Sequence, residues 1–470
     1  MFEKQVYLER RNRLRSKVKD GIILLMGNAD SPMNYSSNTY HFRQDSTFLY
    51  FCGLDFQNLA AVVDVDNNQD IIFGDDLTLD DIIWMGPQPS MQQRAAQVGV
   101  DHTAPYSQLT EVVQEALKKG RKVHFLPPYR ADNKILLDNM LNIPPDQQKQ
   151  QASEELIRAV VDLRSVKDEH EIAALEKVMD VAYEMHTTAM KMAKPGMVEH
   201  QLAGALEGIA ISHGGHLSFP LILTVHGETL HNHYHGNKLQ QGQLLLIDGG
   251  AESEMRYASD HTRTIPVGGK FSDRQKEIYQ IVLDAQMRAI EAIKPGVTFK
   301  SIHMLAAKVI ATGLKELGLM KGDLDAAVQQ GAHALFMPHG LGHMMGLDVH
   351  DMEDLGENYV GYDDEVKRSD LFGTGFLRLG RKLQTGFVVT VEPGTYFIPA
   401  LIEKWEKENK FTEFINYDKV KEYLDFGGIR IEDDILVTDQ GYRVLGKPIP
   451  KTIKDIENFM GGVDTHLGHA

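Results

Sequence analysis

Residues that could bind metal ions occur in order through the second half of this 470-residue chain. Each stands in a short, unusual context: Asp248 in LLLIDGG, Asp260 in ASDHTRT, His343 in PHGLGH, Glu392 in TVEPG and Glu432 in RIEDD. Four carboxylates and one imidazole suit two divalent cations of the manganese type, because carboxylates can bridge two ions and supply the charge that holds both. A pair of such ions can activate water at neutral pH. The set therefore predicts a hydrolytic site.

The two aspartates stand beside predicted strands. The apolar run 244–248 is typical of a buried strand, and an acid at its end is costly unless it is paired or binds a metal. Asp260 follows twelve residues after Asp248, before a β-type run at 262–267, which is a hairpin-like spacing that could bring both acids together. Taken alone, the pair is better explained as two aspartates in turns. The metal interpretation therefore depends on the other three residues.

Histidines gather in two short segments. His339, His343 and His350 lie in MPHGLGHMMGLDVHD, whose glycines disfavour a helix and let the backbone pass close to a ligand. The segment lacks the glutamate of HExxH zinc proteases, so we exclude that motif. The second segment, LHNHYHG at 230–236, would place His231 and its two alternate histidines on one face of a strand. It could form a separate mononuclear metal site, but substrate contact or proton transfer by one histidine is favoured.

The two glutamates also stand next to predicted strands. Glu392 lies between the run 387–391 and a Pro-Gly turn that fixes its direction. Glu432 lies in a strand-like run at 427–437, where a period of two places Arg430 on the same face. Arg430 could therefore orient Glu432 from outside the metal shell. The two aspartates that follow Glu432 are predicted to be structural or solvated.

Composition excludes some classes of protein. A net charge of −17 argues against a nucleic-acid partner, which needs a basic face. Cys52 is the single cysteine, which excludes an intramolecular disulfide and fits a reducing compartment. The charged N-terminus lacks the apolar core of a signal peptide, and the apolar run 21–27 is too short to span a membrane. We expect a cytoplasmic protein without a membrane partner.

The first part of the chain has an α/β pattern. Short β-type runs alternate with a segment of helical spacing, which indicates an α/β domain. The predicted strands cover 22–26, 60–65, 71–74 and 122–125, and the predicted helix covers 109–119.

A domain boundary is expected near residue 160. The polar segment 144–153 is predicted to be a surface connection, which leads to a division into domains 1–160 and 161–470. In the second domain, Lys-Pro-Gly follows a helical segment at 194–196 and again at 294–296. Coincidence explains this repeat about as well as two related halves that face each other across a cleft. The halves gain support because the two aspartates follow the first copy and the remaining ligands follow the second.

The five contexts together resemble the pita-bread metallopeptidases, and specifically the aminopeptidase P and prolidase group. The run FRQDSTFLYFCGLD at 42–55 resembles the N-terminal domain of the same group, so the resemblance covers nearly the whole chain. It implies a pita-bread catalytic domain of two pseudo-symmetric halves, preceded by a smaller α/β domain. It also implies a soluble homodimer or homotetramer that acts on peptides with proline in second position.

The resemblance implies a role for each site residue. Asp248 would bind one metal, Asp260 and Glu432 would bridge two, and His343 and Glu392 would complete the second. The preferred metal would be Mn²⁺, and Glu392 would also carry a proton to the leaving nitrogen. His231 and His350 would contact the peptide and stabilise the tetrahedral intermediate. His339 would help to shape the pocket for proline, and Arg430 would hold the network around Glu432.

Substrate length remains open. Our main hypothesis is an Xaa-Pro aminopeptidase, and the alternative is an Xaa-Pro dipeptidase. Arg378 stands fourteen residues before Glu392, where prolidases resembling this chain carry an arginine that binds the dipeptide carboxylate. Arg378 could equally be one of several surface cations. A third hypothesis, an inactive scaffold, is disfavoured because all five ligand types are present. Trp84 could line a cleft shared between subunits, although a core position is the better expectation.

Overall fold

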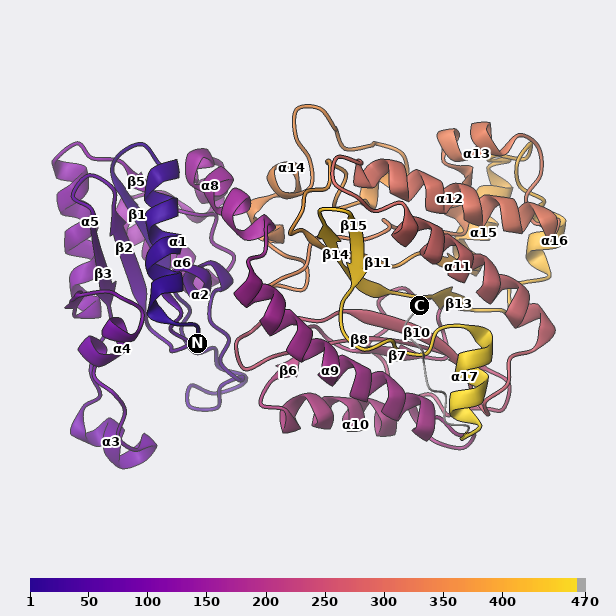
Figure 1. Ribbon diagram of the computed structural model, residues 1–470, viewed down its shortest axis with the longest axis horizontal. Coiled ribbons are helices and arrows are strands. Elements are labelled where there is room, and N and C mark those ends of the chain that lie inside the picture. The colour runs from indigo at the N-terminus through magenta and orange to yellow at the C-terminus, as the bar shows by residue number, and fades with distance from the viewer. Residues whose placement is uncertain (463–470) are drawn as a thin grey trace. The chain divides into compact units, whose positions relative to one another are not determined.

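The computed structural model describes residues 1–462 of the chain (Figure 1). These residues form two compact units. The N-terminal unit contains Met1–Ser165 and the segment Met352–Tyr359, and the second unit contains Val166–Asp351 and the described chain from Val360 onward. None of the helices within residues 1–462 combines the length and apolar character that crossing a bilayer requires.

The N-terminal unit is a five-stranded sheet with helices on both faces. The strand order is β4-β3-β2-β1-β5, with antiparallel pairs in the centre and a parallel pair at each edge. Its helices and strands are α1 (Lys4–Lys17), β1 (Ile22–Met26), α2 (Ser46–Cys52), β2 (Ala60–Asp64), β3 (Gln69–Phe73), α3 (Leu79–Met85), α4 (Met91–Gln97), β4 (His102–Ala104), α5 (Leu109–Lys118), β5 (Val123–His124), α6 (Ala131–Leu141), α7 (Pro145–Gln151) and α8 (Glu154–Ser165). The predicted strands and the predicted helix are confirmed, although β5 is shorter than expected.

Alternation along β1 explains how this sheet acquires helices on both faces. Ile22 and Leu24 pack against α5 and α6 in one apolar cluster. Ile23 and Leu25, which are equally buried, point to the opposite face because successive strand residues alternate. Figure 1 shows α5 on one side of this sheet and α1 on the other.

One of two expectations for this unit was wrong. The polar segment 144–153 is mostly exposed, as expected of a surface connection, and it contains helix α7, which begins at a proline and buries Gln148. Its amide nitrogen donates to the carbonyls of Lys134 and Ile143, so a polar side chain holds the helix where an apolar pattern is absent. Trp84 is not a core residue: its side chain is 86% exposed, because α3 is a seven-residue helix with no buried residue.

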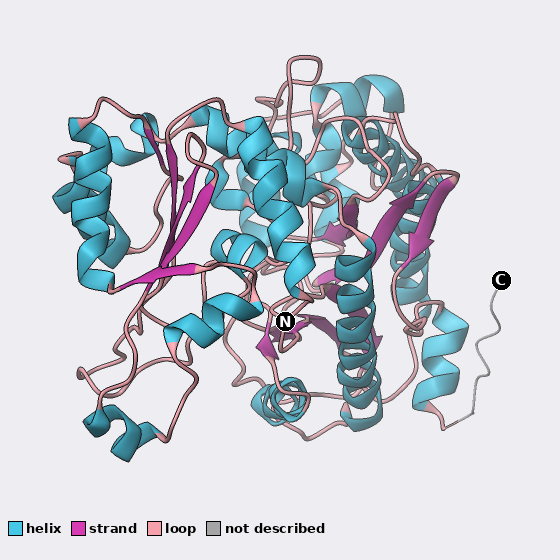
Figure 2. Cartoon of the chain, turned by 60° about the vertical axis from the view of Figure 1, so that its left-hand side comes forward, coloured by secondary structure: helices cyan, strands magenta, loops and turns pink. Residues whose placement is uncertain are grey.

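The second unit contains long paired helices around short strands. Figure 1 shows the pair α9–α10 on one side of β8 and β10 and the pair α11–α12 on the other, and Figure 2 shows how small the strands are beside the helices. The elements are α9 (Glu169–Met192), α10 (Glu199–Ser212), β6 (His216–Leu217), β7 (Ile222–Thr224), β8 (Leu244–Gly249), β9 (Ala251–Glu252), β10 (His261–Pro266), α11 (Asp273–Glu291), α12 (Phe299–Glu316), α13 (Leu324–Gln330), β11 (Val388–Val391), β12 (Gly394–Tyr396), α15 (Pro399–Lys407), α16 (Tyr417–Lys421), β13 (Gly428–Arg430), β14 (Asp433–Thr438), β15 (Gly441–Val444) and α17 (Ile453–Met460), while the short α14 (Glu357–Val360) begins in the segment grouped with the N-terminal unit.

The internal repeat is present in the hydrogen bonds of the backbone. After α9, Gly196 has φ +95° and its N–H donates to the carbonyl of Leu239 over 2.8 Å. After α11, Gly296 has φ +84° and its N–H donates to the carbonyl of Leu383 over the same distance. Positive φ favours glycine at both turns. The repeat predicted from Lys-Pro-Gly therefore reflects two related halves rather than coincidence.

Candidate metal centre

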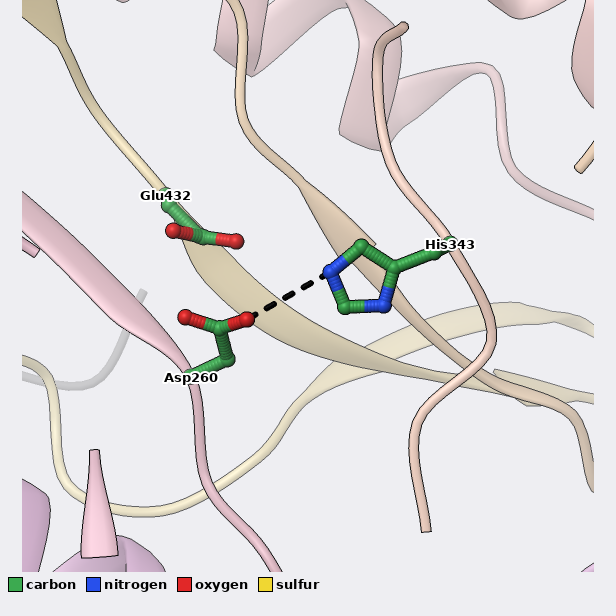
Figure 3. Close-up of side chains that lie close together, drawn as sticks. All are labelled: Asp260, His343 and Glu432. Atoms are coloured by element: carbon green, nitrogen blue, oxygen red, sulfur yellow. Dashed lines mark ion pairs between the residues drawn. The ribbon is translucent and has the colours of Figure 1, made fainter. Parts of the chain in front are cut away.

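Three of the predicted ligands form a compact cluster. One ligand atom from each of Asp260, His343 and Glu432 lies within 4.8 Å of the other two, and all three residues are buried. Figure 3 shows both carboxylates pointing toward the histidine ring, whose Nε2 lies 3.4 Å from Oδ2 of Asp260. His343 Nε2 is also 3.6 Å from Oε1 of Glu392. The cluster has the composition and spacing of a metal site.

Strand pairing brings the two aspartates together, as their spacing predicted. β8 and β10 are antiparallel neighbours in which Thr262 lies opposite Asp248. Asp260 precedes β10 and lies two residues before Thr262, so all three side chains point to one face. Both strands are buried along their whole length. The carboxylates are therefore held by two buried, paired strands of the second unit.

Glu432 occupies a break between strands rather than the continuous strand that was expected. β13 ends at Arg430 and β14 begins at Asp433. At the break, the N–H of Glu432 donates to the carbonyl of Thr262 over 3.0 Å, and the Thr262 hydroxyl donates to Oε2 of Glu432 over 2.6 Å. These long-range bonds place Glu432 beside Asp260, and the local pattern of alternation does not predict them.

His343 lies in a loop that requires glycine. A Cβ on Gly342 would be 2.0 Å from the carbonyl oxygen of Thr390, so no other residue fits without a shift of the loop. The N–H of His343 donates to the Thr390 hydroxyl, and His343 Nδ1 lies 2.9 Å from the carbonyl of Met344. A proton on Nδ1 satisfies that carbonyl and leaves the Nε2 lone pair directed toward the carboxylates, as a metal ligand requires.

Arg430 contacts Asp248 rather than Glu432. Its Nη2 donates to Oδ2 of Asp248 over 2.6 Å, and its Nη1 donates to the hydroxyl of Tyr396 over 2.8 Å. Its Nε lies 3.4 Å from the hydroxyl of Thr262, which in turn donates to Glu432. The link between Arg430 and Glu432 that the spacing predicted therefore passes through Thr262.

The electrostatics of the cluster fit a bound cation. Burial and the neighbouring carboxylates raise the pKa of Asp260 and of Glu432 well above their usual values. The pKa of Glu392 is raised to about 7, mainly by burial and also by the nearby Asp260, while His343 opposes the shift. Within the described chain, Oδ1 of Asp248 and Oδ1 of Asp260 are buried without a hydrogen-bond partner. A metal ion would give the unpaired carboxylate oxygens a partner, and its positive charge would favour the ionised carboxylates.

All ten predicted site residues line one cavity of about 520 Å³. The five ligand-type residues share its wall with the residues predicted to contact substrate, which are His231, His339, His350, Arg378 and Arg430. The His350 ring lies 4.2 Å from that of His343 between centroids. Apolar side chains, including Phe219, Ile222 and Phe376, complete the lining. The cavity therefore offers both a polar centre and apolar walls for a substrate.

The alternate histidines at 231–235 do not form a strand. They lie in an irregular loop after β7, in which His231 and His233 line the cavity. His235 does not line it, and its Nδ1 lies 3.0 Å from the carbonyl of Leu223. The single shared face predicted from a period of two is therefore wrong, because the loop turns between the histidines.

Tyr396 is a part of the site that sequence reasoning missed. Its buried hydroxyl lies 2.8 Å from Nε2 of His339 and accepts a hydrogen bond from Arg430. Burial raises the pKa of Tyr396 to about 12 and lowers that of His339 to about 4, so both are neutral near pH 7. The available signal was the position of Tyr396 on β12, directly after the Pro-Gly turn that follows Glu392.

A buried cluster of carboxylates and histidine within a substrate-sized cavity defines a metallohydrolase site. The model of metallopeptidase family M24 matches residues 173–439, and that of the aminopeptidase P N-terminal domain matches residues 7–124. The chain belongs to metallopeptidase family M24, in the aminopeptidase P and prolidase group. Its fold is thus the pita-bread catalytic fold preceded by that N-terminal domain, and it is a metallopeptidase of the Xaa-Pro group.

Relatives with different substrate lengths are about equally similar to this chain. It is 31% identical to the human Xaa-Pro dipeptidase, over 97% of this chain and 92% of that one. It is 32% identical to a probable Xaa-Pro aminopeptidase of Uncinocarpus reesii, over 94% and 90%. The structure of Pseudomonas aeruginosa aminopeptidase PepP superposes with a TM-score of 0.81 at 27% identity, over 98% of each chain. Similarity alone therefore does not choose between aminopeptidase and dipeptidase.

Proposed function

We propose that the protein is an Xaa-Pro aminopeptidase that uses two divalent metal ions, preferably Mn²⁺, to remove an N-terminal residue that precedes proline. The observation that carries the proposal is that the five ligand-type residues line the same cavity as His231, His339 and His350. Metal ligands next to side chains that can donate hydrogen bonds suit the hydrolysis of a peptide bond. The tertiary amide before proline resists most peptidases, so a dedicated cavity is a reason for such an enzyme to exist.

The five ligand-type residues would hold the two ions. Asp248 would hold one ion, His343 and Glu392 would hold the other, and Asp260 and Glu432 would contribute to both. The oxygen-rich donor set favours Mn²⁺ over softer metals. When bound, the ions would supply Lewis-acid polarisation of the scissile carbonyl and would lower the pKa of water.

Glu392 is the proposed proton carrier. Its carboxylate lines the cavity, and its Oε1 lies 3.6 Å from Nε2 of His343, so it would lie within reach of a water held at the metal ions. Oε1 of Glu392 lies 3.5 Å from the Thr390 hydroxyl, which limits how far the carboxylate can turn. We propose that Glu392 takes a proton from the attacking water and delivers it to the proline nitrogen as the bond breaks.

The histidines are proposed to hold the peptide. His231 and His350 would donate to the oxygen on which negative charge develops in the tetrahedral intermediate. His339, fixed by Tyr396, would form part of the wall that accepts the proline ring. Burial lowers the pKa of His231, which supports a neutral ring that both donates and accepts.

An Xaa-Pro dipeptidase is the second candidate, and Arg378 is the observation that favours it. Its side chain lines the cavity and is therefore not simply a surface cation. A dipeptidase must recognise the carboxylate that follows proline, and a guanidinium does so with two parallel hydrogen bonds. An aminopeptidase must leave that direction open for the rest of the peptide.

A paired assay tests both candidates. Wild-type protein and Arg378→Ala are compared on a Gly-Pro dipeptide and on a longer Xaa-Pro-Xaa peptide with added Mn²⁺. The aminopeptidase proposal expects cleavage of the longer peptide with little effect of Arg378→Ala. Selective loss of dipeptide cleavage in Arg378→Ala supports the dipeptidase instead. Full activity of Asp260→Ala would contradict the metal mechanism, and Mn²⁺ binding without cleavage of either peptide would indicate a scaffold.

A further inference from the structure

A buried glutamate outside the cavity holds the loop that carries His231. Glu199 is the first residue of α10 and its relative exposure is 0%. Oε1 accepts the N–H of Val225 over 2.8 Å, and Oε2 accepts the N–H of Asn237 over 3.1 Å. The side-chain amide of Asn237 donates to both oxygens over 3.2 and 3.0 Å. One carboxylate therefore binds both ends of the loop 225–237.

This loop forms part of the cavity wall, and much of its backbone lies outside helices and strands. It begins directly after β7, and the backbone from 231 to 237 has no helix or strand. His231 and His233 line the cavity from its middle. The donors to Glu199 are uncharged, so the carboxylate is stabilised by hydrogen bonds and by the positive end of the α10 dipole. Because a buried carboxylate without these donors is costly, the loop and the glutamate stabilise each other.

The internal repeat shows that the backbone geometry does not require a carboxylate here. The N–H of Glu199 donates to the carbonyl of Asn237 over 3.0 Å, and in the second half the N–H of Phe299 donates to that of Arg381 over 3.0 Å. Phe299, the counterpart of Glu199, is buried and apolar. The same pairing of helix start and loop thus forms with either side chain. The carboxylate is an addition specific to the half that carries His231.

We infer that Glu199 is a positioning residue for catalysis, which holds the loop 225–237 so that His231 meets the peptide. The inference rests on the proposed function, because it assigns His231 to substrate contact. Glu199 itself does not line the cavity. Its effect therefore passes through the main chain at Val225 and Asn237, the two points where the carboxylate binds the loop.

Glu199→Gln tests this inference with little change of shape. Glutamine offers one acceptor in place of two, and its amide would face an N–H group that needs an acceptor. The loss of a hydrogen bond to a charged acceptor corresponds to a fall in kcat/KM of about tenfold or more. The fall should appear mainly in kcat, because His231 is assigned to the intermediate. Glu207→Gln is the matched control: this exposed glutamate lies on the same helix and should leave kcat/KM unchanged.

A double-mutant cycle separates positioning from general damage. In a His231→Ala background, Glu199→Gln should change kcat/KM less than twofold, because the group that it positions is gone. Mn²⁺ affinity should remain within twofold, since no metal ligand lies in the loop. An unchanged kcat/KM in Glu199→Gln, or an equal fall with and without His231, would overturn the inference.

Hydrogen exchange provides a readout that does not depend on activity. Peptides that cover 225–237 should exchange faster in Glu199→Gln than in wild type, while the rest of the second unit keeps its protection. If Glu199→Gln does not fold, Asn237→Ala takes its place, because it removes only the side-chain donors to Glu199. It should give a smaller fall in kcat/KM and a smaller increase in hydrogen exchange at 225–237. If the wild-type protein cleaves no Xaa-Pro peptide, the proposed function is refuted. If hydrogen exchange at 225–237 is unchanged in both variants, only the positioning role of Glu199 is refuted.

Discussion

Replacing Arg263 should destabilise the second unit more than any surface substitution. This arginine is 1% exposed on β10, and its Nη2 donates to Oδ1 of Asp433 over 2.6 Å. Its other bonds reach four main-chain carbonyls, which belong to Thr262, Glu432, Ile449 and Pro450. Arg263 therefore connects β10, the backbone of Glu432 and the segment before α17.

The expected magnitude follows from these contacts. Removal of one partner of a buried ion pair costs about 3–5 kcal/mol. Lys451 still donates to Oδ2 of Asp433 over 2.7 Å, so the ion-pair part of the loss lies near the lower end of that range. The carbonyls that lose a donor add to it, and a total near 5 kcal/mol is expected for Arg263→Met. That is a large share of the about 5–15 kcal/mol that stabilises a typical protein.

Trp405 offers a direct assay. It is 2% exposed in the second unit, whereas Trp84, the other tryptophan of the chain, is 86% exposed in the N-terminal unit. Urea unfolding followed by tryptophan fluorescence in a Trp84→Phe background therefore reports on the second unit. Arg288→Met, an exposed arginine on α11, is the control and should change the free energy of unfolding by about 0.5 kcal/mol or less. A loss below about 1 kcal/mol in Arg263→Met would refute the reasoning.

Three further outcomes are expected. Burial lowers the pKa of His303 and His333 to about 3 and about 4, so below about pH 6.5 the unfolded chain binds protons first. Each of these two histidines therefore lowers the free energy of unfolding by up to about 1.4 kcal/mol per pH unit as the pH falls toward 4. In urea titrations between pH 7 and pH 4.5, the double variant His303→Gln/His333→Gln should lose less stability with falling pH than the wild type. Parallel curves of stability against pH for the two proteins would contradict this. Tyr396→Phe should lower kcat/KM about tenfold without loss of fold by circular dichroism, because the hydroxyl joins His339 to Arg430. Gly342→Ala should weaken Mn²⁺ binding at least about tenfold by calorimetry, since its Cβ would displace the His343 loop; unchanged affinity would show that the loop adapts.

Local patterns in the sequence predicted the elements that carry the site. The apolar run that ends at Asp248 forms β8, and the β-type run after Asp260 forms its antiparallel neighbour β10. Strong apolar patterns of this kind specify burial directly, which is why the placement of both aspartates followed from them. The Lys-Pro-Gly repeat likewise pointed to the two related halves, because a glycine at positive φ lies in the turn that follows the helix in each copy.

Contacts between distant segments were not predictable in the same way. Spacing assigned Arg430 to Glu432, but the guanidinium contacts Asp248, which lies 182 residues away in the sequence. Alternation predicted a strand through Glu432, but the bridge to Thr262 interrupts it. In each case a residue far along the chain supplies the hydrogen bond that decides the local geometry. A period of two or 3.6 carries no information about that partner.

The two halves also differ in how they hold the loops that carry His231 and Arg378. In the first half, the loop that carries His231 is bound at both ends by the carboxylate of Glu199. In the second half, the equivalent backbone pairing meets the apolar Phe299, and Arg378 lies three residues before the paired Arg381. His231, which we propose contacts the tetrahedral intermediate, thus stands on the loop that Glu199 binds. Arg378, which we propose recognises the far end of a dipeptide, stands on the loop where Phe299 takes the place of that glutamate. We therefore expect substitutions of Arg378 to change the preferred peptide length without moving His231.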